Sequence, residues 1–165
     1  MKIPISGASS TVRVAWDNLS KVPGGNVLFS KGVGQVAPYS GSIGAIIEEL
    51  GPGTARVSLK DRRKVRNHLR SVHAIALVNL AEIASGLAMM YGIPDDARGI
   101  LRGFSIEFLK KARGKLIATC AFDAPQTNEK KDYDVEVNIY NEAEEIVAKA
   151  NALWRIGPMK EEGND

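Results

Sequence analysis

The sequence has very little cysteine and few aromatic residues. Cys120 is the one cysteine among 165 residues, so no disulfide forms within the chain, and such usage is typical of a reducing compartment. Residues 1–6 lack the apolar core of a signal peptide. We therefore expect a cytoplasmic protein. Aromatic residues make up 6% of the sequence and none interleaves with a basic run, which disfavours nucleic acid as a partner.

Motifs of several enzyme classes are also missing. His68 and His73 are the two histidines, and they have no recognised metal-ligand spacing, so we expect no metal site. The segment Gly32-Val-Gly34-Gln-Val-Ala37 imitates a dinucleotide-binding fingerprint, but Pro38 follows it where the motif requires a helix. No Gly-x-Ser-x-Gly occurs, and Cys120 lies in a strand pattern without a nearby histidine. Serine and cysteine hydrolases are therefore disfavoured.

The net charge is +3, and the basic residues gather in two places. One is the segment 61–70. The other lies between two predicted strands and holds Lys110, Lys111, Arg113 and Lys115. Both clusters can bind phosphate groups, of a nucleic acid or of a nucleotide-bearing cofactor, and both can equally be solvated turns.

Apolar and polar residues alternate along much of the chain, which predicts antiparallel strands. The expected strands are 42–50, 54–59, 100–108, 116–122 and 132–140. The turn Gly51-Pro52-Gly53 joins the first two into a hairpin. Residues 141–155 suit either a strand or a helix, and we favour a strand because it would cover the edge of the sheet.

Residues 72–91 predict one long helix, because alanine, leucine and methionine dominate the segment and Gly92 ends it. The helix is apolar almost all round, so it is either buried or a membrane span. Polar residues within it favour burial in protein. The whole layout predicts an α+β fold, an antiparallel sheet curled round one long central helix. We expect an irregular or helical extension at 1–41, with a short helix at 11–19, one domain at 42–157 and a charged tail at 158–165.

The polar residues of this helix, Asn79, Glu82 and Ser85, lie on one stripe. Burial would raise the pKa of Glu82 toward the range of a general base. The alternative is a structural carboxylate that is hydrogen-bonded at a subunit interface. We expect self-association, because the chain's own sheet need not cover this stripe.

The segment before the helix can serve a second part of a site. Backbone N–H groups at a helix start are unpaired and suit a developing oxyanion, although Ser71 can cap one of them. Asn67 can position a water molecule or a carbonyl group. His73 is either part of this site or a structural histidine bonded to backbone.

Asn67, His73 and Glu82, spaced by six and nine residues, resemble the motif Asn-x5-His-Gly-Gly followed by Leu-Ala-Asp of hotdog-fold acyl-CoA thioesterases. The phenylacetate-pathway type is the most similar, and the string from Arg66 to Glu82 also resembles a poorly characterised thioesterase-like branch. The resemblance covers about residues 40–157. It implies that Glu82 is the catalytic carboxylate and that the backbone N–H of Ala74 binds the thioester carbonyl. Ala74 and Ile75 replace the paired glycines of the family.

The resemblance further implies hydrolysis of an acyl-CoA, with Glu82 as general base or nucleophile and Asn67 and His73 orienting water or substrate. It implies a dimer or tetramer, and no cofactor except coenzyme A as part of the substrate. The expected substrate-binding residues are Asn79, Ser85, Arg102, Lys110, Lys111 and Arg113. A module that binds acyl-CoA or a fatty acid without turnover is the alternative.

Overall fold

The long central helix α4 spans Ala74–Gly92 in the computed structural model, which describes residues 7–159. Most of its apolar side chains are buried, and the helix contacts every strand of one sheet. The helix begins two residues later than the sequence pattern predicts, because His73 is its N-cap. Within the described part of the chain, α4 is also the single helix long and apolar enough to cross a membrane. Its burial makes it the core helix of the fold.

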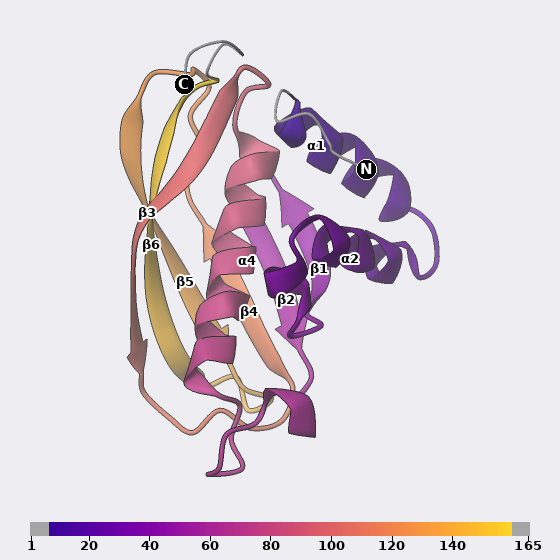
Figure 1. Cartoon of the computed structure of the whole chain (residues 1–165), viewed down its shortest axis with the longest axis vertical. Coiled ribbons are helices and arrows are strands. Elements are labelled where there is room, and N and C mark those ends of the chain that lie inside the picture. Colours follow the sequence, from indigo (N-terminus) through magenta and orange to yellow (C-terminus); the bar gives the residue numbers. More distant parts are fainter. Residues whose placement is uncertain (1–6, 160–165) are drawn as a thin grey trace.

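Six antiparallel strands curl round this helix (Figure 1). They are β1 (Ile46–Gly51), β2 (Thr54–Leu59), β3 (Ala97–Phe108), β4 (Leu116–Ala121), β5 (Lys131–Tyr140) and β6 (Ile146–Pro158). Their order in the sheet is β1-β2-β4-β5-β6-β3. Alternate residues of β5, Val135, Val137 and Ile139, are fully buried, as the period of two requires. The predicted hotdog fold is confirmed.

Three helices precede the sheet, namely α1 (Ala8–Leu19), α2 (Gly25–Val36) and the short α3 (Pro38–Gly41). Of these, α1 and α3 pack against α4 while α2 packs against β1 (Figure 1). Trp16 of α1 and Phe29 of α2 meet edge to face, with ring centroids 5.1 Å apart. Both rings belong to the main hydrophobic core. The helix predicted at 11–19 is therefore confirmed, and α2 is a helix that its glycine-rich sequence did not indicate.

Two boundaries differ from expectation. The strand predicted at 42–50 begins only at Ile46, because Gly44 adopts a left-handed φ of 63° and the Arg62 guanidinium lies against it. Arg62 Nη2 also donates a hydrogen bond to the carbonyl of Ile43, at 2.7 Å. The ambiguous segment 141–155 forms a turn and then β6, so the strand interpretation is confirmed. Of the predicted charged tail, residues 160–165 lie outside the described residues.

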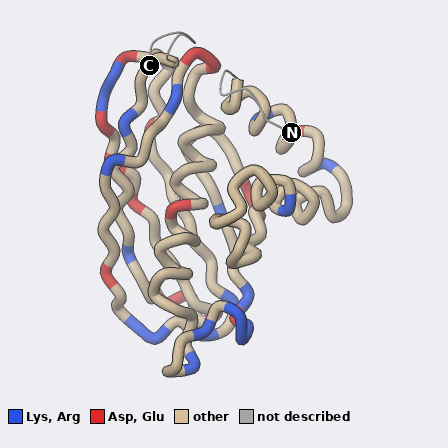
Figure 2. Tube along the Cα trace, in the orientation of Figure 1, with Lys and Arg blue, Asp and Glu red and all other residues tan. Residues whose placement is uncertain are grey.

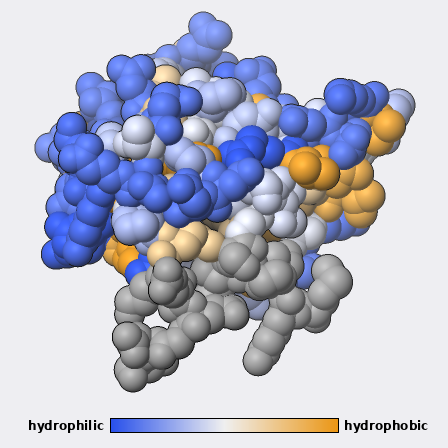
Figure 3. All heavy atoms as spheres, turned by 90° about the horizontal axis from the view of Figure 1, so that it is seen from above, coloured by the Kyte–Doolittle hydropathy of each residue, from blue (hydrophilic) through white to orange (hydrophobic). Residues whose placement is uncertain are grey.

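Charged and apolar side chains are distributed unevenly over the surface. Lysine and arginine gather at the end of the molecule where α4 begins (Figure 2). Seen from the opposite end, apolar side chains gather on the side of α1 and α2 (Figure 3). The large apolar residues exposed on these helices and their connection are Val14, Val22, Val27, Leu28 and Val36. The two helices thus bury one apolar face and present a second one outward.

Candidate active site

Glu82 lies midway along α4, half-buried at the wall of a cavity of about 250 Å³. Burial raises the pKa of this carboxyl group above its ordinary value. Within residues 7–159, no hydrogen bond or ion pair offsets this burial. A carboxylate held in this way is a stronger base than an exposed one, because its charged form is poorly solvated. The prediction of a raised pKa is therefore confirmed.

The cavity beside Glu82 is mostly apolar. Its lining includes Val33, Leu87, Met89, Met90, Ile93 and Trp154. Gly86 follows Glu82 by one helical turn and leaves space that a side chain would take. A Cβ atom there would lie 3.3 Å from Cζ2 of Trp154 and 3.5 Å from Oε1 of Glu82. The absence of a side chain at position 86 thus keeps the carboxylate open to the cavity.

The other polar residues of the helix stripe have partners inside the chain. Ser85 is fully buried, accepts a hydrogen bond from Nε1 of Trp154 at 3.2 Å and donates one to the carbonyl of Glu82 at 3.1 Å. Asn79 is buried and donates to the carbonyl of Tyr39 at 3.3 Å. The expectation that the chain leaves this stripe uncovered is therefore wrong for Asn79 and Ser85, which contact α3 and β6, whereas Glu82 remains half-buried without a partner in residues 7–159.

The start of α4 presents one free amide. The imidazole Nδ1 of His73 accepts the N–H of Ile75 at 3.0 Å, and the carbonyl of His73 accepts those of Ala76 and Leu77. No acceptor within the described residues takes the N–H of Ala74. His73 thus has the structural role that the sequence left open, and Ala74 carries the amide available to a ligand.

Asn67 organises the loop before the helix. Its Oδ1 accepts the backbone N–H of Leu69 at 2.9 Å and that of Ser71 at 3.2 Å. The N–H of Asn67 in turn donates to the carbonyl of Ser71 at 2.8 Å. These bonds close a compact loop, in which Arg70 adopts a left-handed φ of 56°. Asn67 therefore fixes the position from which the helix starts.

A second cavity, of about 240 Å³, lies at this end of the helix. His73 and Asn79 line it together with Tyr39 and the basic residues Lys64 and Arg66. Glu82 does not line it, and neither His73 nor Asn79 lines the Glu82 cavity. Of the predicted site residues, Glu82 thus lines one cavity and His73 and Asn79 line the other, while Asn67, Ala74 and Ser85 line neither.

The two basic clusters of the sequence meet in the structure. Arg113 Nη2 donates to the carbonyl of Leu69 at 3.3 Å, and the N–H of Val72 donates to the carbonyl of Ala112 at 2.8 Å. Lys110 and Lys111 are both exposed, and Lys110 forms an ion pair with Glu145 at 2.5 Å. Together these residues form the basic end seen in Figure 2.

Arg102 lies apart from both cavities. It is exposed, at the point of β3 where the register with β6 shifts between Leu101 and Gly103. A regular alternation along the predicted strand 100–108 would place Arg102 on the side of Phe104 and Ile106, but this bulge interrupts the alternation. Phe104 and Ile106 pack against the core, and Arg102 does not line either cavity.

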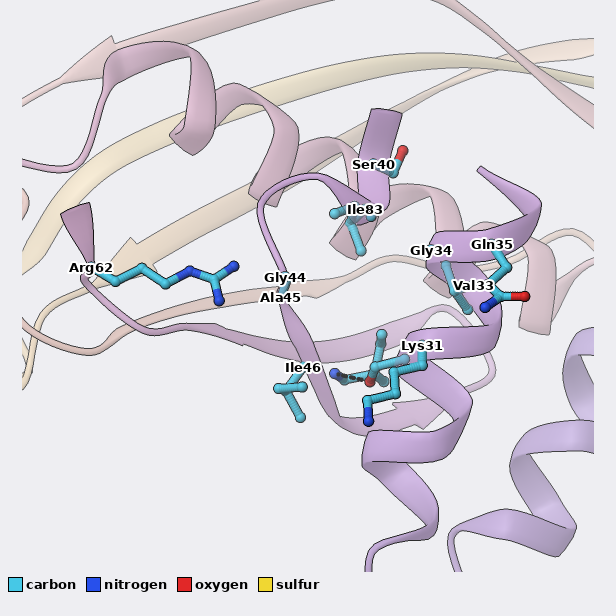
Figure 4. Close-up of a pocket in the computed structure, with 13 residues that line it drawn as sticks. Lys31, Val33, Gly34, Gln35, Ser40, Gly44, Ala45, Ile46, Arg62 and Ile83 are labelled. Carbon is cyan, nitrogen blue, oxygen red and sulfur yellow. Dashed lines mark hydrogen bonds between the residues drawn. The ribbon is translucent and has the colours of Figure 1, made fainter. Parts of the chain in front are cut away.

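A third and larger cavity, of about 460 Å³, was not predicted from the sequence. It lies between α2, α3 and the start of β1, with Lys31 and Arg62 at its margin (Figure 4). Its walls depend on α2, whose helical nature the sequence did not indicate. Val33, Ser40 and Ile83 line both this cavity and the Glu82 cavity, so the two cavities are neighbours.

Cys120 does not have the surroundings of a nucleophile. It is buried under the central helix, and its Sγ donates to the carbonyl of Ala84 at 3.4 Å. Burial raises the pKa of the thiol to about 12. Since the thiolate is the reactive form, this cysteine is inert near neutral pH.

The comparisons with known proteins agree with this architecture. A family model described as a domain of unknown function, DUF4442, matches residues 25–156. A crystal structure from a genomics programme is 34% identical over 92% of this chain and 99% of that chain, with a TM-score of 0.77. No curated protein sequence matches this chain.

More distant solved structures share the fold. A Pseudomonas aeruginosa protein of unknown function, described as a probable thioesterase, is 20% identical over 96% of this chain and 99% of that chain, with a TM-score of 0.67. A thioesterase of Haemophilus influenzae is 14% identical over 81% of this chain and 94% of that chain, with a TM-score of 0.69. At these identities the similarity establishes a thioesterase-like hotdog fold.

Proposed function

We propose that this chain, which belongs to the DUF4442 family, hydrolyses acyl-CoA thioesters with the carboxylate of Glu82. The observation that carries the proposal is the position of Glu82, a carboxylate without a partner in residues 7–159, half-buried at the wall of an apolar cavity. A buried charge without a partner lowers the stability of the fold, and carboxyl groups placed in this way cluster at functional sites. The thioesterases that share the fold make thioester hydrolysis the reaction to test first.

In the proposed reaction, Glu82 acts as a general base on water. The carboxylate removes a proton as the water oxygen bonds to the thioester carbon, and the carbonyl oxygen becomes an oxyanion. The C–S bond then breaks, and the coenzyme A thiolate takes up the proton that Glu82 received. The alternative is direct attack by Glu82 to form a mixed anhydride, which water then hydrolyses. Neither route needs a metal or a bound cofactor.

The N–H of Ala74 is the proposed oxyanion donor, and its distance from Glu82 requires a second chain. Glu82 follows Ala74 by eight residues, which corresponds to about 12 Å along a helix axis. Groups that act on one carbonyl must lie within about 3–3.5 Å of the reacting atoms. We propose that Ala74 of one protomer faces Glu82 of another, as the resemblance to hotdog thioesterases implies.

The edge strand β3 is the proposed contact between protomers. Within the described residues it pairs with β6 on one side, and its other edge carries no strand over Ala97–Phe108. Ile100, Leu101 and Phe108 are exposed along it. A long apolar edge of this kind is a site for pairing with another strand. A dimer is the smallest assembly that this contact forms, and light scattering tests it.

The basic end is the proposed site for the phosphates of coenzyme A. The exposed Lys111 and the partly engaged Arg113 lie beside the loop that leads to Ala74. Phosphate oxygens placed there would leave the pantetheine arm to reach the start of α4. Reversing the charge at Lys111 should raise KM for acyl-CoA, and should leave KM unchanged for an acyl-pantetheine that lacks the nucleotide.

The test of the function is thiol release from a panel of acyl-CoAs by the wild-type protein and Glu82→Gln. The panel includes an aryl-acetyl thioester, because the phenylacetate-pathway branch remains a prediction. We expect turnover by the wild type and a loss of about 10²–10⁴-fold in the variant. If both proteins bind acyl-CoA saturably and neither hydrolyses it, the alternative of a binding module is supported instead. The hydrogen bonds of Asn67 and His73 to the backbone also fit that role.

We expect the protein to encounter this substrate in the cytoplasm.

A further inference from the structure

The Glu82 cavity is elongated along the second half of α4. Its lining includes Glu82, Gly86, Met90 and Ile93 in succession. Gly92, the last residue of α4, lies ten positions after Glu82, which corresponds to about 15 Å along the helix axis. A volume of about 250 Å³ spread over that length describes a slender space rather than a round one.

The first helix forms the far end of this cavity. Ala8 and Ser9 of α1 line it, with Met159 after the last strand. Arg13 attaches α1 to the end of α4 by donating hydrogen bonds to the carbonyls of Tyr91, at 3.0 Å, and Ile93, at 2.8 Å. These carbonyls lie at the C-terminal end of α4, where a cation is favoured. These two hydrogen bonds of Arg13 hold the end wall of the cavity in place.

The side walls are apolar and adaptable. Met89, Met90 and Met159 contribute flexible thioether side chains, which adjust to irregular apolar ligands. Gly99 on β3 has no side chain where that of Met89 lies. Val33, Ser40 and Ile83 line both this cavity and the larger one of Figure 4, so the two lie next to each other. A chain that enters beside Glu82 is therefore guided along α4 toward α1.

We infer that this cavity takes the acyl chain of a medium-chain aliphatic thioester, and that Ala8 of α1 sets the maximum chain length. The inference rests on the proposed function for the position of the thioester at Glu82. An engineered cavity of about 150 Å³ holds a benzene molecule, so a space of about 250 Å³ holds by proportion roughly ten carbon atoms. Longer chains would meet the wall made by α1.

The test compares three variants over butyryl-, octanoyl- and palmitoyl-CoA. Ala8→Phe fills the far end and should lower kcat/KM for octanoyl-CoA about tenfold or more, the discrimination typical of a few methylenes in an apolar pocket. It should lower kcat/KM for butyryl-CoA much less, because a four-carbon chain is too short to reach Ala8. Met90→Ala enlarges the cavity and should improve palmitoyl-CoA relative to octanoyl-CoA. Thr11→Phe, in the same helix turn but exposed and outside the cavity, is the matched control and should leave the profile as in the wild type.

Binding is measured alongside turnover, by the thermal shift that octanoic and palmitic acids produce in the same variants. If the acids show the same length limit, moved by Ala8→Phe and Met90→Ala, the chain-length inference stands even when no protein hydrolyses a thioester. If thioesters are hydrolysed but neither variant changes the profile, the inference is overturned and the thioesterase stands. Should Ala8→Phe fail to fold, the Met90→Ala profile decides in the same way.

Discussion

The imidazole Nδ1 of His73 accepts the backbone N–H of Ile75 at 3.0 Å and so caps α4 one residue beyond Ala74. The N–H of Ala74 is left without an acceptor in the described structure, at the first position of the helix. Because His73 itself has φ −62° and ψ 140°, its backbone suits a following proline. This geometry allows the amide to be removed without breaking the helix.

Ala74→Pro should therefore fold normally and lose activity. Proline is favoured at the first helical position, where its missing N–H would in any case have no partner in the helix. Loss of an oxyanion donor lowers kcat by about 10²–10³-fold. Thiol release measures the loss, and circular dichroism with thermal unfolding checks the fold.

Ala74→Ser is the control for this change, because it alters the side chain and keeps the N–H. It should retain most of the wild-type kcat. A folded Ala74→Pro protein with wild-type kcat would show that this amide does not bind the oxyanion.

Glu82→Gln should stabilise the protein at neutral pH. Burial raises the pKa of Glu82 in the folded state above its value in the unfolded chain, which is about 4.3. At a pH between these two pKa values, the folded state binds more protons than the unfolded state. Stability contributed by this group therefore falls as pH rises through that window. The glutamine variant lacks this loss, so its free energy of unfolding should exceed that of the wild type at pH 8 and converge with it near pH 4.

Urea unfolding at several pH values measures the difference. Glu49→Gln, which changes an exposed glutamate on β1, is the matched control and should change the free energy of unfolding much less than Glu82→Gln does. A glutamine variant at position 82 that is less stable than the wild type at pH 8 would mean that the carboxylate has a stabilising partner, such as one across a subunit interface.

Ser85→Ala should destabilise the fold by about 1–3 kcal/mol, because it leaves the buried indole N–H of Trp154 without an acceptor. Urea unfolding measures the change, and Ser105→Ala, at an exposed position on β3, should cost much less. Trp154→Phe combined with Ser85→Ala should cost less than the sum of the single changes, since the two side chains form one hydrogen bond. Full additivity would show that the bond contributes nothing.

The core of the fold follows from periodicity in the sequence. The period of two in 132–140 places Val135, Val137 and Ile139 on the helix side of the sheet, and the uniformly apolar run 72–91 has to be enclosed. Both features are local, so the sequence alone suffices to predict them. Glu82 is conspicuous for the same reason, as a charge within an apolar helix.

The remaining features depend on contacts between distant segments. The α2 helix is stabilised by packing, with Phe29 on Trp16 and Gly34 directly against Gly41, and its intrinsic propensity is low. The partners of Asn79 and Ser85 come from α3 and β6, far away in the sequence. Because these contacts cannot be read from spacing, neither the burial of Asn79 and Ser85 nor the placement of Glu82 and His73 at different cavities was predictable.

Mixing Ala74→Pro with Glu82→Gln tests most directly whether the site is built from Ala74 of one protomer and Glu82 of another. Each variant alone is expected to be inactive. After the two are unfolded together and refolded in equal amounts, half of the dimers are mixed and each has one intact site, so about a quarter of the wild-type thioesterase activity should return. If the refolded mixture stays as inactive as its components while forming mixed dimers, the two groups do not act together across the interface and the proposed site is wrong.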